Sequence, residues 1–241
     1  MNEVILVTGG ALRLGAETAR VLHAAGMRVV VHYQRSAAAA QDLVRDLNDA
    51  RADSALSVAG DLRDPEAITH IVDTAAGHWG RLDGLVNNAS VFRATPVAEA
   101  SLEDWGSIFD VNLRAPFLLA QAAYPWLSRQ GGAIVNLTDI YAERPKAGFA
   151  LYCTAKAGLL GLTRVLAREF APSVRVNAVA PGAILWPEQG EEAEQARLLG
   201  RTPLGRAGEP GDIAAAVLYL LSAPYVTGQE IAVDGGRSIN D

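Results

Sequence analysis

Short runs of apolar residues alternate along the chain with longer stretches in which apolar residues recur at helical spacing. The short runs are rich in valine, isoleucine and leucine with few polar interruptions, which is typical of parallel strands covered on both faces. They predict strands at residues 4–8, 28–32, 54–58, 84–87, 133–137, 175–179 and 230–233. The longer stretches predict helices at residues 14–25, 37–50, 65–80, 102–129, 153–170 and 210–222.

This order of elements predicts an α/β fold in which one parallel sheet is doubly wound, with helices on both faces. Right-handed crossovers leave few other topologies for such an order. No repeat, low-complexity tract or linker divides the 241 residues, so we expect a single domain over residues 1–241. Ligands of these sheets bind beyond the carboxyl ends of the strands. Residues at those ends are therefore the first candidates for a binding site.

The composition narrows the class of partner. A formal net charge of −6 disfavours nucleic acid and anionic membranes, both of which attract basic surfaces. No apolar run reaches the roughly 18 to 20 residues of a membrane span, and no secretory signal is visible. The single cysteine, Cys153, fits a reducing compartment, and the four histidines lack the spacing of a zinc site. We expect a cytoplasmic protein with a small-molecule substrate and no metal.

A glycine-rich turn follows the first predicted strand and opens the first predicted helix. Residues 8–15 read Thr-Gly-Gly-Ala-Leu-Arg-Leu-Gly. Glycine lets a backbone approach a pyrophosphate closely, and a helix N-terminus offers free N–H groups to it. A tight turn without a ligand is the alternative, but this strand–turn–helix context favours a dinucleotide. The candidate cofactor residues of the turn are Gly9, Arg13, Leu14 and Gly15.

The end of the second strand carries a basic residue where sites selective for NADH place an acidic one. Residues 32–36 read His-Tyr-Gln-Arg-Ser, without a carboxylate. Arg35 and Ser36, with Arg13 from the glycine turn, are suited to a 2′-phosphate, whose shape a guanidinium matches. We therefore expect NADPH as cofactor. The alternative is that Arg13 and Arg35 are ordinary solvated surface charges. The candidate cofactor residues of this segment are His32, Tyr33, Arg35 and Ser36.

Further candidates stand at the other strand ends. A short polar side chain there can bond an adenine or a ribose, or can cap a helix, as Asp64 before Pro65 is expected to do. The candidates for cofactor binding are Asp61 and Leu62 after the third strand, Asn88, Ala89 and Ser90 after the fourth, Thr138 after the fifth, and Pro181 and Gly182 after the sixth.

A tyrosine and a lysine four residues apart share one face of the fifth helical stretch. A cation beneath the phenol favours phenolate, so Lys156 is expected to lower the pKa of Tyr152 from its usual value of about 10. The same pair also occurs by chance in ordinary helices. Asn112 stands within another apolar helical stretch, where asparagine has poor propensity and needs a water or a backbone group to hold.

Together these residues resemble the short-chain dehydrogenase/reductase family over essentially the whole chain. The order and spacing of the glycine turn, Asp61, residues 87–89, Asn112, the Tyr152/Lys156 pair, residues 181–182 and the closing Val-Asp-Gly-Gly at 233–236 agree with that family. The resemblance implies a seven-stranded parallel Rossmann sheet, a nicotinamide cofactor and Tyr152 as proton donor. It further implies that Lys156 holds the nicotinamide ribose and that Asn112 supports a water chain leading to Lys156.

Two departures from the general family resemble the pteridine reductase subgroup. Arg13 stands where the family has a third glycine, and Asp139 stands where it has a serine. Beside a desolvated tyrosine, an aspartate can hold a proton or pass one to Tyr152, as reduction of a pterin C=N bond needs. Phe92 would then stack on the pterin. The alternatives are a turn or cap residue for Asp139 and a buried loop aromatic for Phe92.

Three functions stay open. The first is NADPH-dependent reduction of a dihydropterin, including dihydrofolate; the second is reduction of a ketone or 3-oxoacyl thioester; the third is a non-catalytic sensor of NADP(H). Residues 183–201 are expected to form a substrate flap in which Trp186 either lines the pocket or packs elsewhere. The resemblance also implies a homotetramer. The expected catalytic residues are Asp139, Tyr152, Lys156 and Asn112, and the expected substrate contacts are Ser90, Phe92, Asp139, Tyr152 and Trp186.

Overall fold

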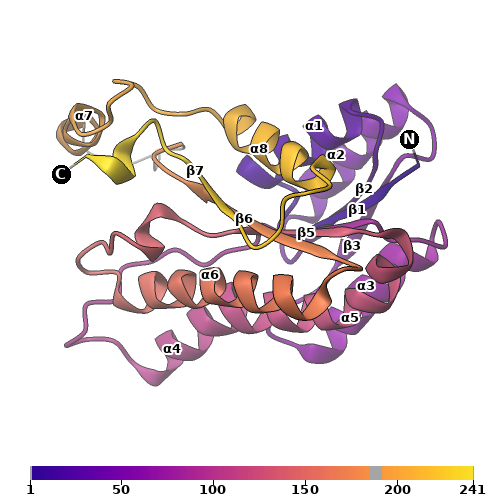
Figure 1. The fold of residues 1–241 in the computed structure, drawn as a ribbon, viewed down its shortest axis with the longest axis horizontal. Helices are drawn as coiled ribbons and strands as arrows, with labels where there is room; N and C mark the ends of the chain where they lie inside the picture. The colour runs from indigo at the N-terminus through magenta and orange to yellow at the C-terminus, as the bar shows by residue number, and fades with distance from the viewer. Residues whose placement is uncertain (1, 185–191, 241) are drawn as a thin grey trace.

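The computed structural model describes residues 2–184 and 192–240 and contains a seven-stranded sheet in which every strand pair is parallel. The strand order is β3-β2-β1-β4-β5-β6-β7, so the chain winds outward from β1 in one direction and then in the other. The predicted doubly wound Rossmann sheet is therefore confirmed (Figure 1). The strands are β1 Val4–Val7, β2 Arg28–Tyr33, β3 Ala55–Ala59, β4 Gly84–Asn87, β5 Ala133–Leu137, β6 Arg175–Pro181 and β7 Glu230–Val233.

Helices cover both faces of this sheet (Figure 1). One face is covered by α1 Arg13–Ala24, α2 Ala37–Ala50 and α8 Pro210–Ser222. The other is covered by α3 Pro65–Gly77, α5 Ala115–Gln130 and α6 Ala150–Phe170, while the short α4 Leu102–Phe109 packs against α6. The helices cover the two faces of the sheet, and the carboxyl ends of the strands lie at a cavity between the two helical layers.

The two faces of β1 show why its sequence is continuously apolar. Val4 and Leu6 belong to the core under α3, α5 and α6, whereas Ile5 and Val7 belong to the core under α1, α2 and α8. All four side chains are at most 2% exposed. A strand that alternated apolar and polar residues would leave polar groups in one of these cores, at a cost in desolvation.

The expected single helix at 102–129 is interrupted, which corrects that prediction. A π-helical turn, Asp110–Arg114, separates α4 from α5. Asn112 lies in this turn, and its side-chain amide bonds the backbone of Val91, accepting from the N–H at 2.8 Å and donating to the carbonyl at 2.9 Å. These bonds supply the backbone partner that a buried asparagine needs, and such π turns often occur at functional sites.

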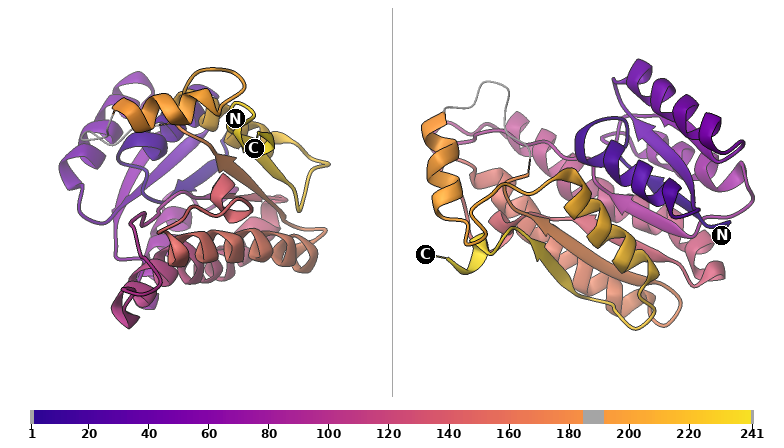
Figure 2. Two further views of the ribbon diagram at one scale, coloured as in Figure 1. Left: turned by 90° about the vertical axis from the view of Figure 1, so that its left-hand side faces the viewer. Right: turned by 90° about the horizontal axis from the view of Figure 1, so that it is seen from above.

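Two further elements differ from the expected pattern. Helix α6 begins at Ala150, before Tyr152, so the tyrosine lies inside the first turn of the helix. The expected flap contains a helix, α7 Glu192–Gly200. Helix α7 lies beside the short 3-10 helix η3 Arg237–Ile239 near the carboxyl terminus (Figure 2). Trp186 lies outside the residues that the structure describes.

A pair of glycine substitutions tests the packing of this fold. A Cβ on Gly132, between α5 and β5, would lie 2.5 Å from the carbonyl oxygen of Asp83, so Gly132→Ala should lower the free energy of unfolding by about 1–3 kcal/mol. A Cβ on Gly161, in α6, would meet nothing within 4 Å, so Gly161→Ala should raise it by roughly 0.5–1 kcal/mol. Urea unfolding monitored by circular dichroism measures both. Equal stabilities for the two variants would contradict the close approach at Gly132.

Candidate functional site

A cavity of about 900 Å³ lies at the carboxyl ends of the strands, where the fold leaves the two helical layers apart. Cavities of this size are typical of small-molecule and cofactor sites. Of the residues predicted for the site, Asn112 does not line this cavity and Trp186 is outside the described residues. The predicted residues that the structure brings together here are Gly9, Arg13, Leu14, Gly15, His32, Tyr33, Arg35, Ser36, Asp61, Leu62, Asn88, Ala89, Ser90, Phe92, Thr138, Asp139, Tyr152, Lys156, Pro181 and Gly182.

The glycine turn is packed tightly against the end of β4. Gly9 has a φ of +59°, and a Cβ on Gly15 would lie 2.2 Å from the carbonyl oxygen of Gly9. The Asn88 amide donates to the carbonyls of Thr8 and Gly9 at 2.8 and 3.0 Å. No side chain of the described residues caps the N-terminus of α1, whose first N–H groups are therefore free to bind an anion. Asn88 thus fixes the shape of the turn from the neighbouring strand.

His32 holds the glycine turn from the other side. Its Nδ1 accepts from the N–H of Gly9 at 3.1 Å, and its Nε2 lies 3.1 Å from the carbonyl oxygen of Gly60. This pattern fits a neutral ring protonated on Nε2, and burial lowers the pKa of His32 accordingly. Both ring nitrogens are therefore used by backbone groups, so His32 positions the turn that would hold the cofactor.

Two exposed guanidinium groups border the same end of the cavity. Arg13 has a φ of +53°, in the left-handed region that favours glycine, at the position where the resemblance implies a third glycine. Arg35 lies two residues after the end of β2 and is exposed as well. Neither arginine forms an ion pair within residues 2–184 and 192–240. Tyr33 and Ser36 lie beside them on the cavity wall.

The acidic residue after β3, Asp61, forms an ion pair with a neighbouring arginine. Asp61 accepts from the guanidinium of Arg63, with its Oδ2 and Nη2 2.5 Å apart, and this interaction lowers the pKa of Asp61 to about 2. Asp61 is therefore ionised at neutral pH while it faces the cavity. Asp64 caps α3 by accepting from the N–H of Glu66 at 2.9 Å, which confirms the expected helix cap.

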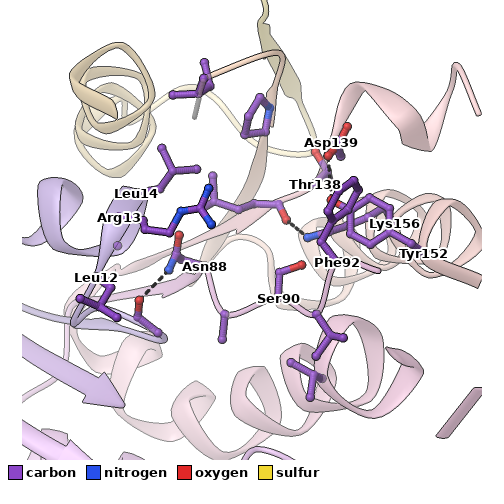
Figure 3. Close-up of a pocket in the computed structure, with 18 of the residues that line it drawn as sticks. Leu12, Arg13, Leu14, Asn88, Ser90, Phe92, Thr138, Asp139, Tyr152 and Lys156 are labelled. Atoms are coloured by element: carbon purple, nitrogen blue, oxygen red, sulfur yellow. Dashed lines mark hydrogen bonds between the residues drawn. The ribbon is translucent and has the colours of Figure 1, made fainter. Parts of the chain in front are cut away.

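Three ionisable side chains meet at the other end of the cavity. The Tyr152 hydroxyl donates to Oδ2 of Asp139 at 2.7 Å, while Oδ1 accepts from the N–H of Tyr141 at 2.9 Å. Asp139 is therefore both a cap of the short helix η2 Ile140–Ala142 and a partner of the tyrosine. The Lys156 ammonium donates to the carbonyl of Leu137 at 2.6 Å and lies 5.7 Å from the Tyr152 ring centroid. Figure 3 shows the three side chains together.

Burial dominates the electrostatics of this group. Desolvation raises the pKa of Asp139 and lowers the pKa of Lys156 to about 8. Burial, and then the charge of Asp139, raise the pKa of Tyr152, which corrects the expectation that Lys156 would lower it. Asp139 is bonded directly to the phenol, whereas Lys156 is bonded to a backbone carbonyl. If Asp139 were protonated, it would carry no charge, and its contribution to raising the pKa of Tyr152 would be lost.

Phe92 forms an aromatic wall beside the tyrosine. Its ring stacks on Phe149, with centroids 4.6 Å apart and planes 17° apart, and meets Tyr152 edge-on at 4.7 Å. Phe92 is 53% exposed, so the alternative of a buried loop aromatic is wrong. One face of the phenylalanine pair is thus available to a planar ligand.

Several residues that line the cavity were not indicated by any sequence motif. Lys146 stands in a polar loop, and Arg237 follows the closing glycines, so neither falls at a strand end or in a recurring pattern. Tyr141 lies between them, and the α7 residues Gln195 and Leu198 also face the cavity. These residues are connected only by the cavity that they line in the folded chain, and a sequence does not show which residues share a cavity.

Other kinds of site are not found in the part of the chain that the structure describes. No group of three or more histidine, cysteine, aspartate and glutamate side chains there is arranged to hold a metal ion. None of the described helices has the length and apolar character needed to cross a bilayer.

The chain is similar in sequence to known reductases. A family model described as Enoyl-(Acyl carrier protein) reductase matches residues 10–238. A 3-oxoacyl-[acyl-carrier-protein] reductase of Synechocystis sp. is 36% identical over 239 residues, which cover 97% of this chain and 96% of the relative. Pteridine reductase 1 of Leishmania tarentolae is 36% identical over 278 aligned residues, covering 98% of this chain and 96% of the relative.

A solved structure agrees with the fold as well. The chain superposes on a blue fluorescent protein from a metagenomic library, crystallised in complex with NADPH, with a TM-score of 0.91 and 37% sequence identity. The match covers 98% of this chain and 97% of that one. Sequence and fold therefore agree, and the chain belongs to the short-chain dehydrogenase/reductase family of oxidoreductases.

Proposed function

We propose that this protein is an NADPH-dependent reductase that transfers hydride to the C=N bond of a dihydropterin. The observation that supports this substrate class is the 2.7 Å hydrogen bond from the Tyr152 phenol to Asp139, where the wider family has a serine. An ionised aspartate cannot donate to a substrate carbonyl as serine does, whereas a protonated one can supply a proton.

The cavity residues fit NADPH. The Gly9–Gly15 turn leaves no room for a further Cβ and presents the free N-terminus of α1, as binding of a pyrophosphate requires. The exposed guanidinium groups of Arg13 and Arg35, with Ser36, would hold a 2′-phosphate. Lys156 would hold the nicotinamide ribose. When bound, the cofactor supplies the hydride.

The protein's own residues would supply the accompanying proton. Reduction of a C=N bond places a proton on the substrate nitrogen, and the Tyr152 hydroxyl faces the cavity as its donor. Asp139 is bonded to that hydroxyl, and its raised pKa favours the protonated acid that can restore the tyrosine proton. Phe92 would stack on the pterin ring and hold it beside Tyr152. Asn112, which braces Val91, would support a water chain to Lys156.

A second candidate is reduction of a ketone or 3-oxoacyl thioester. Two of the compared relatives, from Synechocystis sp. and Thermotoga maritima, are named 3-oxoacyl-[acyl-carrier-protein] reductases, and one is named a pteridine reductase. The relatives thus support this alternative better than the pterin interpretation. The aspartate at position 139, bonded to Tyr152, supports a pterin substrate instead. A non-catalytic sensor would need neither Tyr152 nor Lys156 in this arrangement.

Substrate turnover separates the candidates. Purified protein is given NADPH with a dihydropterin, dihydrofolate or an acetoacetyl thioester, and the loss of absorbance at the NADPH band is measured. We expect kcat/KM for the dihydropterin to exceed that for the thioester by about tenfold or more, because the site lacks the serine donor that a ketone needs. Preference for the thioester would establish the second candidate, and no turnover of any substrate would favour the sensor.

Replacing the aspartate tests its chemical role. Asp139→Ser removes the acid that would restore the proton of Tyr152 and introduces the wider family's residue, so kcat for the dihydropterin should fall about 100-fold or more, as for loss of a general acid. Turnover of the thioester should not fall with it, because a serine hydroxyl can donate to a carbonyl. Asp139→Asn, which keeps the size and loses the acid, is the matched control for shape. Unchanged pterin turnover in both variants would refute the role.

Cofactor selectivity tests the role of Arg35. Arg35→Gln should raise KM for NADPH about tenfold and leave KM for NADH unchanged, because only NADPH carries the phosphate. Arg20→Gln, on α1 and outside the cavity, removes the same charge and serves as control. Equal Michaelis constants for the two cofactors in the unmodified protein would contradict the assignment at once.

A further inference from the structure

We propose that Glu230 is a positioning residue for the proton-transfer group: as a neutral carboxylic acid it donates to Thr138 and thereby fixes the end of β5 that carries Asp139. The proposal rests on the proposed reductase function and adds to it a residue outside the cavity. Glu230 is the first residue of β7, and it does not line the cavity. Its carboxyl contacts the cavity wall at Thr138.

The end of β5 holds the ionisable groups of the site through consecutive residues. The carbonyl of Leu137 accepts from the Lys156 ammonium at 2.6 Å. Asp139 accepts from the Tyr152 hydroxyl at 2.7 Å. Thr138 lies between these two holding residues and is only 3% exposed, although it lines the cavity. A displacement of Thr138 would therefore disturb both bonds at once.

The hydroxyl of Thr138 lies between two acceptors. Its Oγ1 is 3.0 Å from the carbonyl oxygen of Val179, which also accepts from the Thr138 N–H at 2.9 Å. The same Oγ1 is 2.5 Å from Oε1 of Glu230. A hydroxyl has one hydrogen, so it can donate only one of these bonds. A protonated Glu230 donates the other bond itself, whereas an ionised Glu230 would leave one contact without a hydrogen.

The surroundings of the Glu230 carboxyl favour its neutral form. No lysine or arginine forms an ion pair with it in the parts of the chain that the structure describes. Burial raises the pKa of Glu230; the Thr138 bond and the charge of Arg164 on α6 act against burial, and the charges of Glu143 and Asp139 add to it. A carboxylate removed from water without an ion pair is costly, so the proton is retained.

The elements that pack on β7 are β6 and α8, and each carries one charged side chain. Arg175, at the start of β6, donates to the carbonyls of Leu220 and Leu221 at 2.6 Å. Asp212 belongs to the capping box at the start of α8. Neither group bonds Glu230, so the charges that act on its protonation are those of the three groups named above.

The pH dependence of stability tests the protonation state. An acid whose pKa is raised by folding contributes stability below its unfolded pKa of about 4.3 and loses that contribution as the pH rises through the folded pKa. Glu230→Gln replaces the neutral acid with a neutral amide that still donates to Thr138. The urea midpoint of this variant should therefore gain on that of the unmodified protein between about pH 5 and about pH 8.

Glu143→Gln is the matched control for this series, because it removes an exposed carboxylate of the same size. Its urea midpoint should gain little over the same range of pH, since exposed charges are well screened. A midpoint difference for Glu230→Gln that does not change with pH would show that Glu230 is ionised in the folded protein. That result would overturn the proposal.

Turnover tests the positioning role. Glu230→Met keeps the length of the side chain and removes the donor, so kcat for the dihydropterin should fall about tenfold, because a small displacement of the proton donor slows its reaction. Glu230→Gln should keep kcat within about twofold of the unmodified protein, since its amide donates as the acid does. KM for NADPH should change less than about threefold, because the glycine turn holds the phosphates. Unchanged kcat in Glu230→Met, or an equal loss in both variants, would overturn the role.

A double-mutant cycle makes the test independent of turnover. The shifts in urea midpoint caused by Glu230→Met and Asp139→Asn should be non-additive when the two are combined, because both residues act on one hydrogen-bonded segment. Additive shifts would show that Glu230 does not act on Asp139. If Glu230→Met does not fold, Thr138→Val breaks the same bond from the other side and takes its place. Failure of the proposed reductase function gives a different result, because NADPH oxidation would be absent while the pH-dependent stability and the coupling persisted.

Discussion

The site depends on the removal of water from three ionisable groups that lie in contact with one cavity. Asp139, Tyr152 and Lys156 are all held by short hydrogen bonds, and burial disfavours the charged form of each. In water the carboxyl and the ammonium would be fully charged and the phenol neutral. Their burial brings the proton affinities of the carboxyl and the ammonium toward the neutral range, which suits groups that exchange protons.

The doubly wound sheet supplies the positions that this arrangement needs. The fifth strand ends just before Asp139, α6 begins just before Tyr152, and the carbonyl of Leu137 fixes Lys156 one turn further along the helix. The glycine turn lies beyond the end of β1 in the same cavity. A cofactor held at the glycine turn and the Tyr152 hydroxyl would therefore share one cavity, and no long loop is needed to bring them together.

Much of this was predictable because the relevant signals are local. Continuous apolar strands, the glycine turn and the four-residue spacing of Tyr152 and Lys156 each follow from neighbours in the sequence. The sign of the Tyr152 pKa shift was not predictable, because it depends on burial and on which charge bonds the phenol. The π turn at Asn112 depends on a contact with Val91, 21 residues away. Lys146 and Arg237 meet only in the folded chain.

His32 makes the glycine-turn end of the cavity more rigid. One imidazole ties the glycine turn after β1 to the backbone that follows β3, and Asn88 ties the same turn to the end of β4. Burial lowers the pKa of His32 and so favours the neutral ring that makes both of these bonds. Three strand ends are thus joined into one preformed cradle, so a nucleotide that enters it would lose its own freedom without having to order the protein first.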